Sequence, residues 1–279
     1  MQPVLRTRES LTLLCLSVVG VVALSAAEAQ AANATECTTV GLCYCVNSDF
    51  RPAIDEKVLF FRKLIAEQKA KGKAIGYLSI PLSSIGGSYF GVNREVAAAV
   101  KEKMEGRLGS AAAWVLDPAS KDADLPTLAG VRARQGDYML MWTRILEGTN
   151  ALGEDFDFVY FAGPADFANF FGFDGKADMS KLETYFENRL QKDPDLKKSA
   201  ESGSLTMAMF RNYYALRASV AYSAGAHDEW NIIRLLNGRR RDDLKFGVGN
   251  QLPVLFDGRA VSSGELEQTV AAGNAGPCK

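Results

Sequence analysis

The chain has 279 residues, of which 47% are hydrophobic and 23% charged, with 32 basic side chains against 33 acidic ones. This composition is typical of a globular protein, and it excludes long disordered tracts, collagen-like repeats and a protein with many membrane spans. The even balance of charge argues against nucleic-acid binding. A single histidine, His227, excludes a metal site built from several histidines, and no metal or organic cofactor is implied.

The first 31 residues have the pattern of a secretory signal peptide. Arg6 and Arg8 precede an apolar run over residues 11–27, and two overlapping small-x-small cleavage patterns end at Ala29 and Ala31. The apolar run is shorter than the roughly 20 residues that a membrane-spanning helix needs. We therefore expect cleavage, a periplasmic or secreted protein, and no membrane contact after cleavage.

Residues 32–51 are predicted to form an irregular arm held by cysteines. The mature chain keeps four of them, Cys37, Cys43, Cys45 and Cys278, and an even number in an exported protein favours disulfides. A bridge between Cys43 and Cys45 would be strained, since one residue separates them. We expect Cys278 to bond one of the other three, and the spacing leaves open which one. The same spacing disfavours a four-thiolate zinc site.

Apolar residues at helical spacing, or in continuous short runs, predict the elements of the first half of the remaining chain. In chain order these are a helix over 52–71, a strand over 74–80, a helix over 93–107, a strand over 112–116, a helix over 137–147 and a strand over 157–162. Asn93 is the predicted N-cap of the second helix. A glycine and serine loop precedes that helix, and a polar connection covers residues 119–135.

The second half is predicted to be mainly helical. Its elements are a short helix over 165–173, helices over 179–191, 205–216 and 229–236, a hairpin over 253–261 and a short helix after residue 262. Residues 197–203 are predicted to form a solvated break between helices. Gly238 is predicted to end the helix over 229–236. Residues 218–223 form either a short strand or a continuation of the preceding helix. Asp257-Gly258 is a favoured turn pair for the hairpin.

The alternation of strands and helices predicts an α/β fold with a largely parallel sheet flanked by helices. A cysteine-tied N-terminal arm and a C-terminal hairpin plus helix complete it. Because no repeat and no linker interrupts residues 52–279, they are predicted to form a single domain. The sequence gives no indication of the oligomeric state.

Ligands of open parallel sheets bind beyond the carboxyl ends of the strands, where three loops are expected. The candidate ligand-binding residues in these loops are Ser83, Ser84, Gly86, Gly87, Ser88, Tyr89, Asp117 and Asp166. Glycines let backbone N–H groups approach a ligand, and the following helix start favours a polar or anionic group. The first loop lacks the spacing of a P-loop or a dinucleotide fingerprint, so a small-molecule site and a simple tight turn both remain open.

A polar segment between apolar runs contains His227, Asp228 and Glu229. In the functional interpretation Glu229 is a nucleophile or general base, assisted by Asp228 or His227. In the structural interpretation the two carboxylates stabilise a helix start and His227 is a surface residue.

Two segments resemble nucleoside 2-deoxyribosyltransferase-like proteins. Residues 77–82 (YLSIPL) resemble the strand and proline that open that family, and residues 218–225 (ASVAYSAG) with Glu229 resemble its strand followed by G-x-x-x-E. Where the family has a threonine after the glycine, this chain has Ala226. The resemblance implies that Glu229 attacks the sugar C1′ to form a glycosyl-enzyme, with Asp117 or Asp166 as the sugar-binding or base-binding aspartate.

The expected activity is therefore that of a hydrolase or transferase acting on an N-glycosidic bond or a sugar derivative. The alternative is a non-catalytic periplasmic protein that binds a small molecule or interacts with the cell envelope. Its supporting feature is the number of aromatic residues near the predicted strand ends, among them Tyr77, Tyr89 and Trp114.

Overall fold

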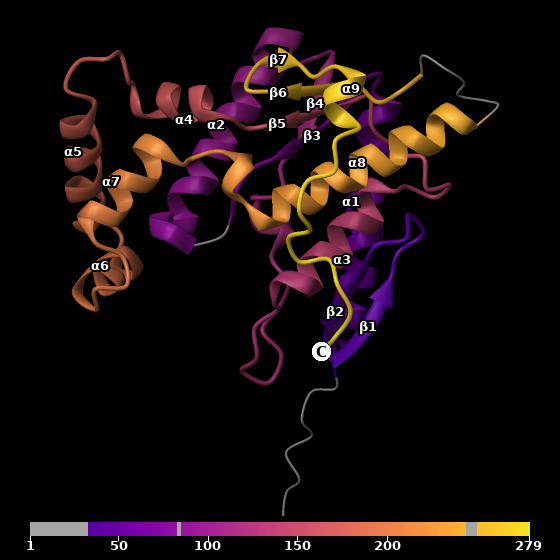
Figure 1. Ribbon diagram of the computed structural model, residues 1–279, viewed down its shortest axis with the longest axis horizontal. Helices are drawn as coiled ribbons and strands as arrows, with labels where there is room; N and C mark the ends of the chain where they lie inside the picture. The colour runs from indigo at the N-terminus through magenta and orange to yellow at the C-terminus, as the bar shows by residue number, and fades with distance from the viewer. Residues whose placement is uncertain (1–32, 83–84, 244–249) are drawn as a thin grey trace, which may run out of the picture. The chain divides into compact units, whose positions relative to one another are not determined.

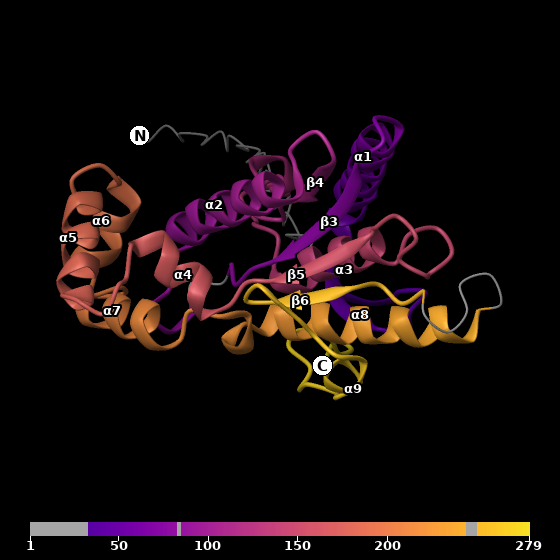
Figure 2. The ribbon, with the colours of Figure 1, turned by 90° about the horizontal axis from the view of Figure 1, so that it is seen from above.

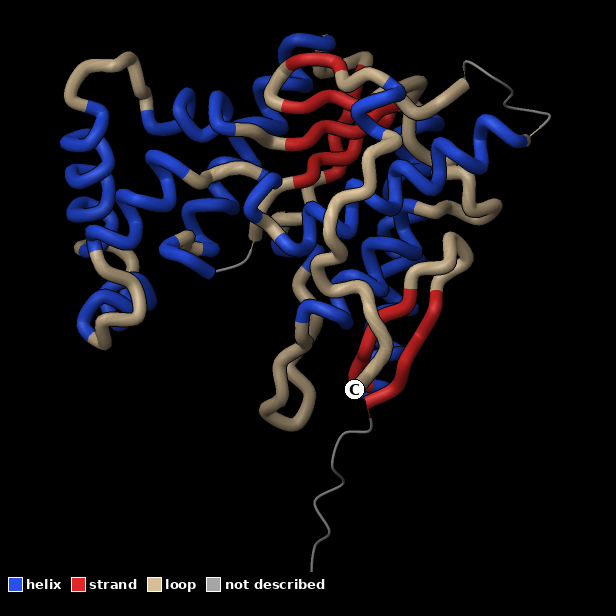
Figure 3. Tube along the Cα trace, in the orientation of Figure 1, coloured by secondary structure: helices blue, strands red, loops and turns tan. Residues whose placement is uncertain are grey.

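The structure, a computed structural model, describes residues 33–82, 85–243 and 250–279. The predicted signal peptide over 1–31 and the candidate loop residues Ser83 and Ser84 lie outside the described residues. The described part combines a mostly parallel five-stranded sheet, flanked by helices, with a separate two-stranded hairpin (Figure 1 and Figure 3). The predicted α/β fold with a largely parallel sheet is confirmed.

The central sheet has the strand order β4-β3-β5-β6-β7. Its strands are β3 (Ala74–Ser79), β4 (Ala113–Leu116), β5 (Phe158–Phe161), β6 (Val254–Phe256) and β7 (Arg259–Ala260). β3 pairs in parallel with β4 and with β5, β6 is parallel to β5, and β7 is antiparallel to β6. Because β4 and β5 lie on opposite sides of β3, the strand order reverses there. Ligands of such sheets bind at this point, beyond the carboxyl ends of the strands.

Helices cover both faces of the sheet. The longer ones are α1 (Arg51–Ala70), α2 (Phe90–Leu108), α3 (Gln135–Leu146) and α8 (Ala224–Asp242). α3 contacts both α1 and α8, whereas α2 packs on β4 and on α4 (Pro164–Phe171). Figure 2 shows α8 along one side of the strands and α2 along the other. Tyr77 of β3 contacts Trp142 of α3, and Phe161 of β5 contacts Trp230 of α8, so both side chains point to the face of the sheet that α3 and α8 cover.

Between β5 and α8 the chain forms a group of helices around an aromatic cluster. They are α5 (Asp178–Leu190), α6 (Pro194–Glu201) and α7 (Met207–Leu216). Phe210 of α7 is fully buried, with its ring 4.4 Å from that of Tyr214 and 5.0 Å from that of Phe186. Within the described ranges, none of the helices is both long and apolar enough to cross a membrane.

The N-terminal arm is a β-hairpin, so the prediction of an irregular arm is wrong. β1 (Asn33–Cys37) pairs antiparallel with β2 (Cys43–Asn47), and Tyr44 and Val46 of β2 are buried. These alternate apolar residues pack β2 on α3. Cys37 bonds Cys43 and Cys45 bonds Cys278, which confirms that Cys278 is linked to the N-terminal cysteines.

Two helix boundaries differ from the prediction, one because of a distant side chain and one because of a local N-cap. α2 begins at Phe90, and Asn93 is buried within it, where its Oδ1 accepts a hydrogen bond of 2.8 Å from the Tyr214 hydroxyl. The predicted break over 197–203 is largely α6, whose N-terminus is capped by the Asp193 carboxylate accepting from the Leu196 N–H.

The C-terminal half of α8 also differs from the prediction, since the helix passes through Gly238 to Asp242. The buried Arg240 guanidinium donates to the carbonyl oxygens of Leu152 and Gly153, at 2.5 and 2.6 Å. These bonds outweigh the low helix propensity of glycine. Residues 218–223 contain a 3₁₀ turn (Val220–Tyr222) in place of the strand or continued helix.

The predicted C-terminal hairpin and helix are confirmed. Asp257 and Gly258 connect β6 and β7 with positive φ of 51° and 84°, as a two-residue hairpin turn requires. α9 (Ser263–Leu266) follows, with the predicted capping box between Ser262 and Glu265.

Candidate functional site

A cavity of about 240 Å³ lies beyond the carboxyl ends of β3 and β4. Ile80 and Leu82 border it after β3, Pro118 after β4, and Met139 and Trp142 from α3. The first turns of α8 close it from the side of Ser223 to Ala226, and Glu229 lies among the lining residues. Most of the surface is apolar, so a polar group of the ligand would have few polar partners, and among the acidic lining residues Asp124 and Glu229 only Glu229 is buried.

Glu229 is held by two hydroxyl groups of β3. The Tyr77 hydroxyl donates to Oε1 and the Ser79 hydroxyl donates to Oε2. Tyr77 and Ser79 are two residues apart on one strand, so both side chains point to the same face of the sheet. Both are fully buried and Glu229 is 6% exposed. The carboxylate orientation is therefore fixed by one strand, while α8 supplies the carboxylate.

Burial is the main reason that the pKa of Glu229 is raised to about 7. The neighbouring Asp228 charge raises it further, and the hydrogen bonds from Ser79 and Tyr77 act in the opposite direction. Burial and the Glu229 charge raise the pKa of Tyr77 well above its ordinary value, so Tyr77 stays a donor. Near neutral pH both protonation states of Glu229 are populated, as a general acid or base requires.

Asp228 points away from this arrangement, although it precedes Glu229 directly. Its fully buried carboxylate accepts backbone N–H bonds from Gly273, Asn274 and Ala275, at 2.8, 2.6 and 3.4 Å. Burial raises its pKa, and these bonds oppose the rise. The Asp228 carboxylate thus binds the C-terminal segment of the chain, whereas the Glu229 carboxylate borders the cavity.

His227 is half-buried on the first turns of α8. Its Nε2 lies 2.9 Å from the carbonyl oxygen of Ala221, in the 3₁₀ turn that precedes the helix. Of the three candidates His227, Asp228 and Glu229, the structure brings Glu229 to the cavity and gives the other two backbone partners.

The described part of the predicted glycine loop packs on the α5–α7 group. Gly86 is exposed, whereas Gly87 and Ser88 are buried. A Cβ on Gly87 would lie 2.2 Å from the backbone oxygen of Met209, so the loop contacts the α7 backbone directly. Gly87 therefore allows the backbone of the loop to come close to the backbone of α7. The neighbours Leu82 and Phe90, on either side of this loop, border the cavity.

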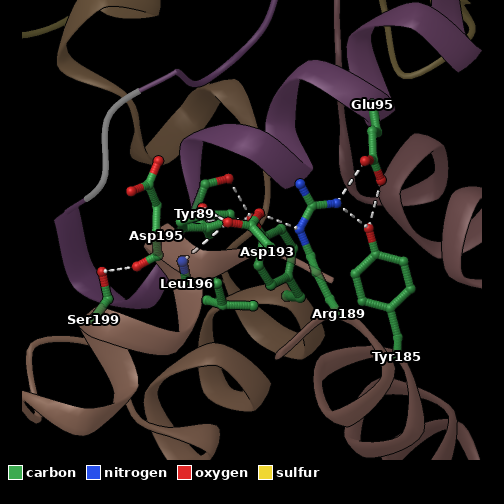
Figure 4. Close-up of polar contacts among 9 residues, drawn as sticks. Tyr89, Glu95, Tyr185, Arg189, Asp193, Asp195, Leu196 and Ser199 are labelled. Carbon is green, nitrogen blue, oxygen red and sulfur yellow. Dashed lines mark hydrogen bonds and ion pairs between the residues drawn. The ribbon is translucent and has the colours of Figure 1, made fainter. Parts of the chain in front are cut away.

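Tyr89 belongs to a polar network that joins α2 to α5 and α6 (Figure 4). Its hydroxyl donates to Asp193 at 2.8 Å, and the Arg189 guanidinium lies 5.4 Å from its ring centroid. Arg189 also pairs with Asp193 at 3.1 Å and with Glu95 of α2 at 2.5 Å, and the Tyr185 hydroxyl donates to Glu95 (Figure 4). These contacts explain the position of Tyr89 without a ligand.

The two candidate aspartates of the other loops lie apart from each other. Asp117 is half-buried beside the cavity-lining Pro118 and accepts a 2.8 Å bond from the Ala119 N–H, and burial raises its pKa. Asp166 is buried in α4, where it accepts from the Tyr160 hydroxyl at 2.8 Å and pairs with Lys103 of α2 at 3.2 Å. Asp117 thus lies near the cavity, whereas Asp166 stabilises the packing of α4 on α2.

The sequence predicts no role for Ser79, Trp142 or Asn274, and it indicates Tyr77 only as one of the aromatic residues near the strand ends. Two hydroxyl side chains two residues apart, at the end of a buried strand, are a usable signal for Tyr77 and Ser79. Asn274 also borders the cavity, and nothing local indicates this, because its position depends on the contacts of the C-terminal segment.

In the part of the chain that the structure describes, no three histidine, cysteine, aspartate or glutamate side chains come together in a way that could hold a metal ion. Comparisons with protein-family models, with curated proteins and with solved structures found no significant match.

Proposed function

We propose that this chain is an exported enzyme, a hydrolase or transferase that acts on an N-glycosidic bond or a related sugar derivative, with Glu229 as the reacting carboxylate. The observation that carries the proposal is a buried glutamate held by two hydroxyls at the edge of a cavity of about 240 Å³. The cavity lies where ligands of parallel α/β sheets bind.

In the proposed reaction the ionised Glu229 attacks the anomeric carbon. The bond from that carbon to the leaving nitrogen breaks, and its electron pair leaves with the base. Water, or a second acceptor in a transfer, then displaces the glutamate, and the proton that this acceptor loses neutralises the released base. Tyr77 and Ser79 orient the carboxylate, and its pKa of about 7 leaves a large fraction ionised at neutral pH.

Two further observations support the proposal. The segments that resemble nucleoside 2-deoxyribosyltransferase-like proteins meet at one point, because Tyr77 and Glu229, 152 residues apart, are hydrogen-bonded. Two disulfides within one chain are typical of an oxidising compartment, which agrees with the predicted export to the periplasm or the exterior.

The test is release of free base from a panel of nucleosides and NAD by the purified mature chain. Glu229→Gln should lose turnover by about a hundredfold or more. Glu147→Gln, which changes a buried carboxylate outside the cavity lining that accepts a hydrogen bond from the Val40 N–H, is the matched control and should retain turnover. Equal loss in both variants, or none in Glu229→Gln, would contradict the assignment of Glu229.

A non-catalytic small-molecule binding or cell-envelope interaction protein is the second candidate. The observation in its favour is that, of the adjacent carboxylates Asp228 and Glu229, only Glu229 borders the cavity. This candidate predicts thermal stabilisation by a panel compound without release of base. Glu229→Gln would then change the affinity alone.

A further inference from the structure

The C-terminal segment, residues 267–279, is fastened along α8. The Trp230 indole N–H donates to the Gln268 carbonyl at 3.2 Å, and the Asn231 amide donates to the Val270 carbonyl at 3.0 Å. A Cβ on Gly273 would lie 1.7 Å from the carbonyl oxygen of Ala224, so the segment is in direct backbone contact with the first turn of α8. That turn is also part of the cavity lining.

The same segment then joins the N-terminal hairpin. The Gly276 N–H donates to the Cys43 carbonyl at 2.7 Å, the Cys278 N–H donates to the Thr35 hydroxyl at 2.9 Å, and Cys278 is bonded to Cys45. The segment is therefore held at both sides of Asn274, by α8 and Asp228 on one side and by the hairpin and its disulfide on the other.

Asn274 lies at the junction of two hollows. It borders the cavity that contains Glu229, and it also borders an outer groove, which we define by Cys45, Arg134, Gly136 and the residues that it shares with the cavity. The shared residues are Gln135 and Asn274. The cavity and the outer groove thus adjoin at two residues that carry amide side chains, Gln135 of α3 and Asn274 of the C-terminal segment, and the Asn274 side chain also hydrogen-bonds the Asp228 carboxylate.

We propose that Asn274 is a substrate-contacting residue that determines specificity, and that Asp228 and the Cys45–Cys278 disulfide position it. A substrate that places its reacting carbon at Glu229 would extend a polar, hydroxyl-bearing or carbonyl-bearing part past Gln135 and Asn274 toward the outer groove. Both amides can donate to and accept from such groups. The identity of the substrate rests on the proposed function, whereas the placement of the segment does not.

Asp228 is a positioning residue in this proposal. Its carboxylate meets the backbone N–H groups of Gly273, Asn274 and Ala275, so neutralising it weakens the attachment of the segment. The hairpin offers a matched control for the covalent attachment. Cys37–Cys43 closes the same hairpin without a covalent link to the C-terminal segment, and the hydrogen bond from Gly276 to the Cys43 carbonyl does not involve the sulfur.

The first experiment is amide hydrogen exchange on the mature chain, on Cys45→Ser/Cys278→Ser and on Cys37→Ser/Cys43→Ser. Loss of the Cys45–Cys278 bond should speed exchange about tenfold or more in residues 267–279 and in the cavity-lining residues 224–229. The control pair should leave both regions as in the wild type. Faster exchange in the segment alone, with residues 224–229 unchanged, would overturn its role as part of the cavity lining.

The second experiment uses the most reactive nucleoside of the panel. Asn274→Ala should raise KM about three- to tenfold, the effect of one lost hydrogen bond, and leave kcat unchanged. Asp228→Asn should raise KM similarly and also move the acidic limb of the pH profile to lower pH, since the Asp228 charge raises the pKa of Glu229. An unchanged KM in Asn274→Ala would overturn the assignment of this residue.

The two proposals fail in different ways. If the wild-type chain releases no base, the proposed function is refuted, and the exchange data still decide whether the segment lines the cavity. If the double cysteine variant does not fold, Asp228→Asn provides the same exchange comparison with all disulfides intact.

Discussion

Glu229→Gln should change how stability depends on pH. The pKa of Glu229 is about 7 in the folded chain, against 4.5 for an ordinary glutamate. Between these values the folded state binds more protons than the unfolded state, so the free energy of unfolding falls as the pH rises. At about 1.4 kcal/mol per pH unit, ionising the buried carboxylate costs on the order of 3 kcal/mol.

The contribution of Glu229 to the free energy of unfolding has a defined sign and a defined pH range. Below pH 4.5 Glu229 is protonated in both states and contributes no pH dependence, and above about pH 7 the loss of stability is complete. Glutamine is uncharged throughout, so the variant lacks this loss. The free energy of unfolding of the wild type, minus that of Glu229→Gln, should therefore fall by on the order of 3 kcal/mol between pH 4.5 and pH 8.

The assay is urea denaturation of both proteins at several pH values, with the disulfides intact and the slopes m compared. Most other titrating groups act alike in both proteins and cancel in the difference. Glu187→Gln, an exposed position on α5, is the control for the substitution and should stay within about 0.5 kcal/mol of the wild type at each pH. A difference between wild type and Glu229→Gln that does not change with pH would refute the argument that burial shifts Glu229.

Two other predictions follow from single contacts. Tyr77→Phe removes a hydrogen bond that lowers the pKa of Glu229. The acidic limb of the pH profile of kcat/KM should therefore move to higher pH. An unchanged limb would show that Tyr77 does not affect the pKa of this carboxylate. Gly136→Ala on α3 should lower stability by about 1–3 kcal/mol, since its Cβ would lie 2.2 Å from the Cys45 carbonyl oxygen. Gly106→Ala on α2 meets no atom within 4 Å and should stabilise by about 0.5–1 kcal/mol. Thermal or urea unfolding compares the two helical glycines, and equal effects would contradict the packing argument.

The sequence predicted those parts of the fold that depend on local pattern. The apolar runs before Pro81 and before Gly163 specify their strands directly, and the Asp257-Gly258 turn specifies the hairpin. The prediction was wrong where distant side chains decide the outcome. Gly238 would end an isolated helix, but Arg240 is bonded to carbonyls near residue 152, and Asn93 is a helix-interior residue that is bonded by Tyr214.

The candidate site was predicted in part for the same reason. Glu229 was found because it belongs to a polar segment between apolar runs and matches a G-x-x-x-E pattern. Its partners Tyr77 and Ser79 share one face of a strand, but only the folded sheet shows that this face meets Glu229 of α8. The glycine loop satisfied local rules for ligand binding, yet its described part packs on α7. Backbone approach to a ligand and backbone approach to another helix need the same residue types, so composition does not separate them.

The different roles of Asp228 and Glu229 follow from helix geometry. Consecutive residues on an α-helix point about 100° apart, so adjacent carboxylates diverge and do not act on one atom together. In α8 the first meets the backbone of the C-terminal segment and the second meets the hydroxyls of β3. Two adjacent carboxylates that the sequence suggests as an acid and base pair thus have separate roles: Asp228 binds the C-terminal segment, and Glu229 borders the cavity. The two remain linked by charge, because Asp228 raises the pKa of Glu229, so neutralising Asp228 is expected to lower the pKa of Glu229.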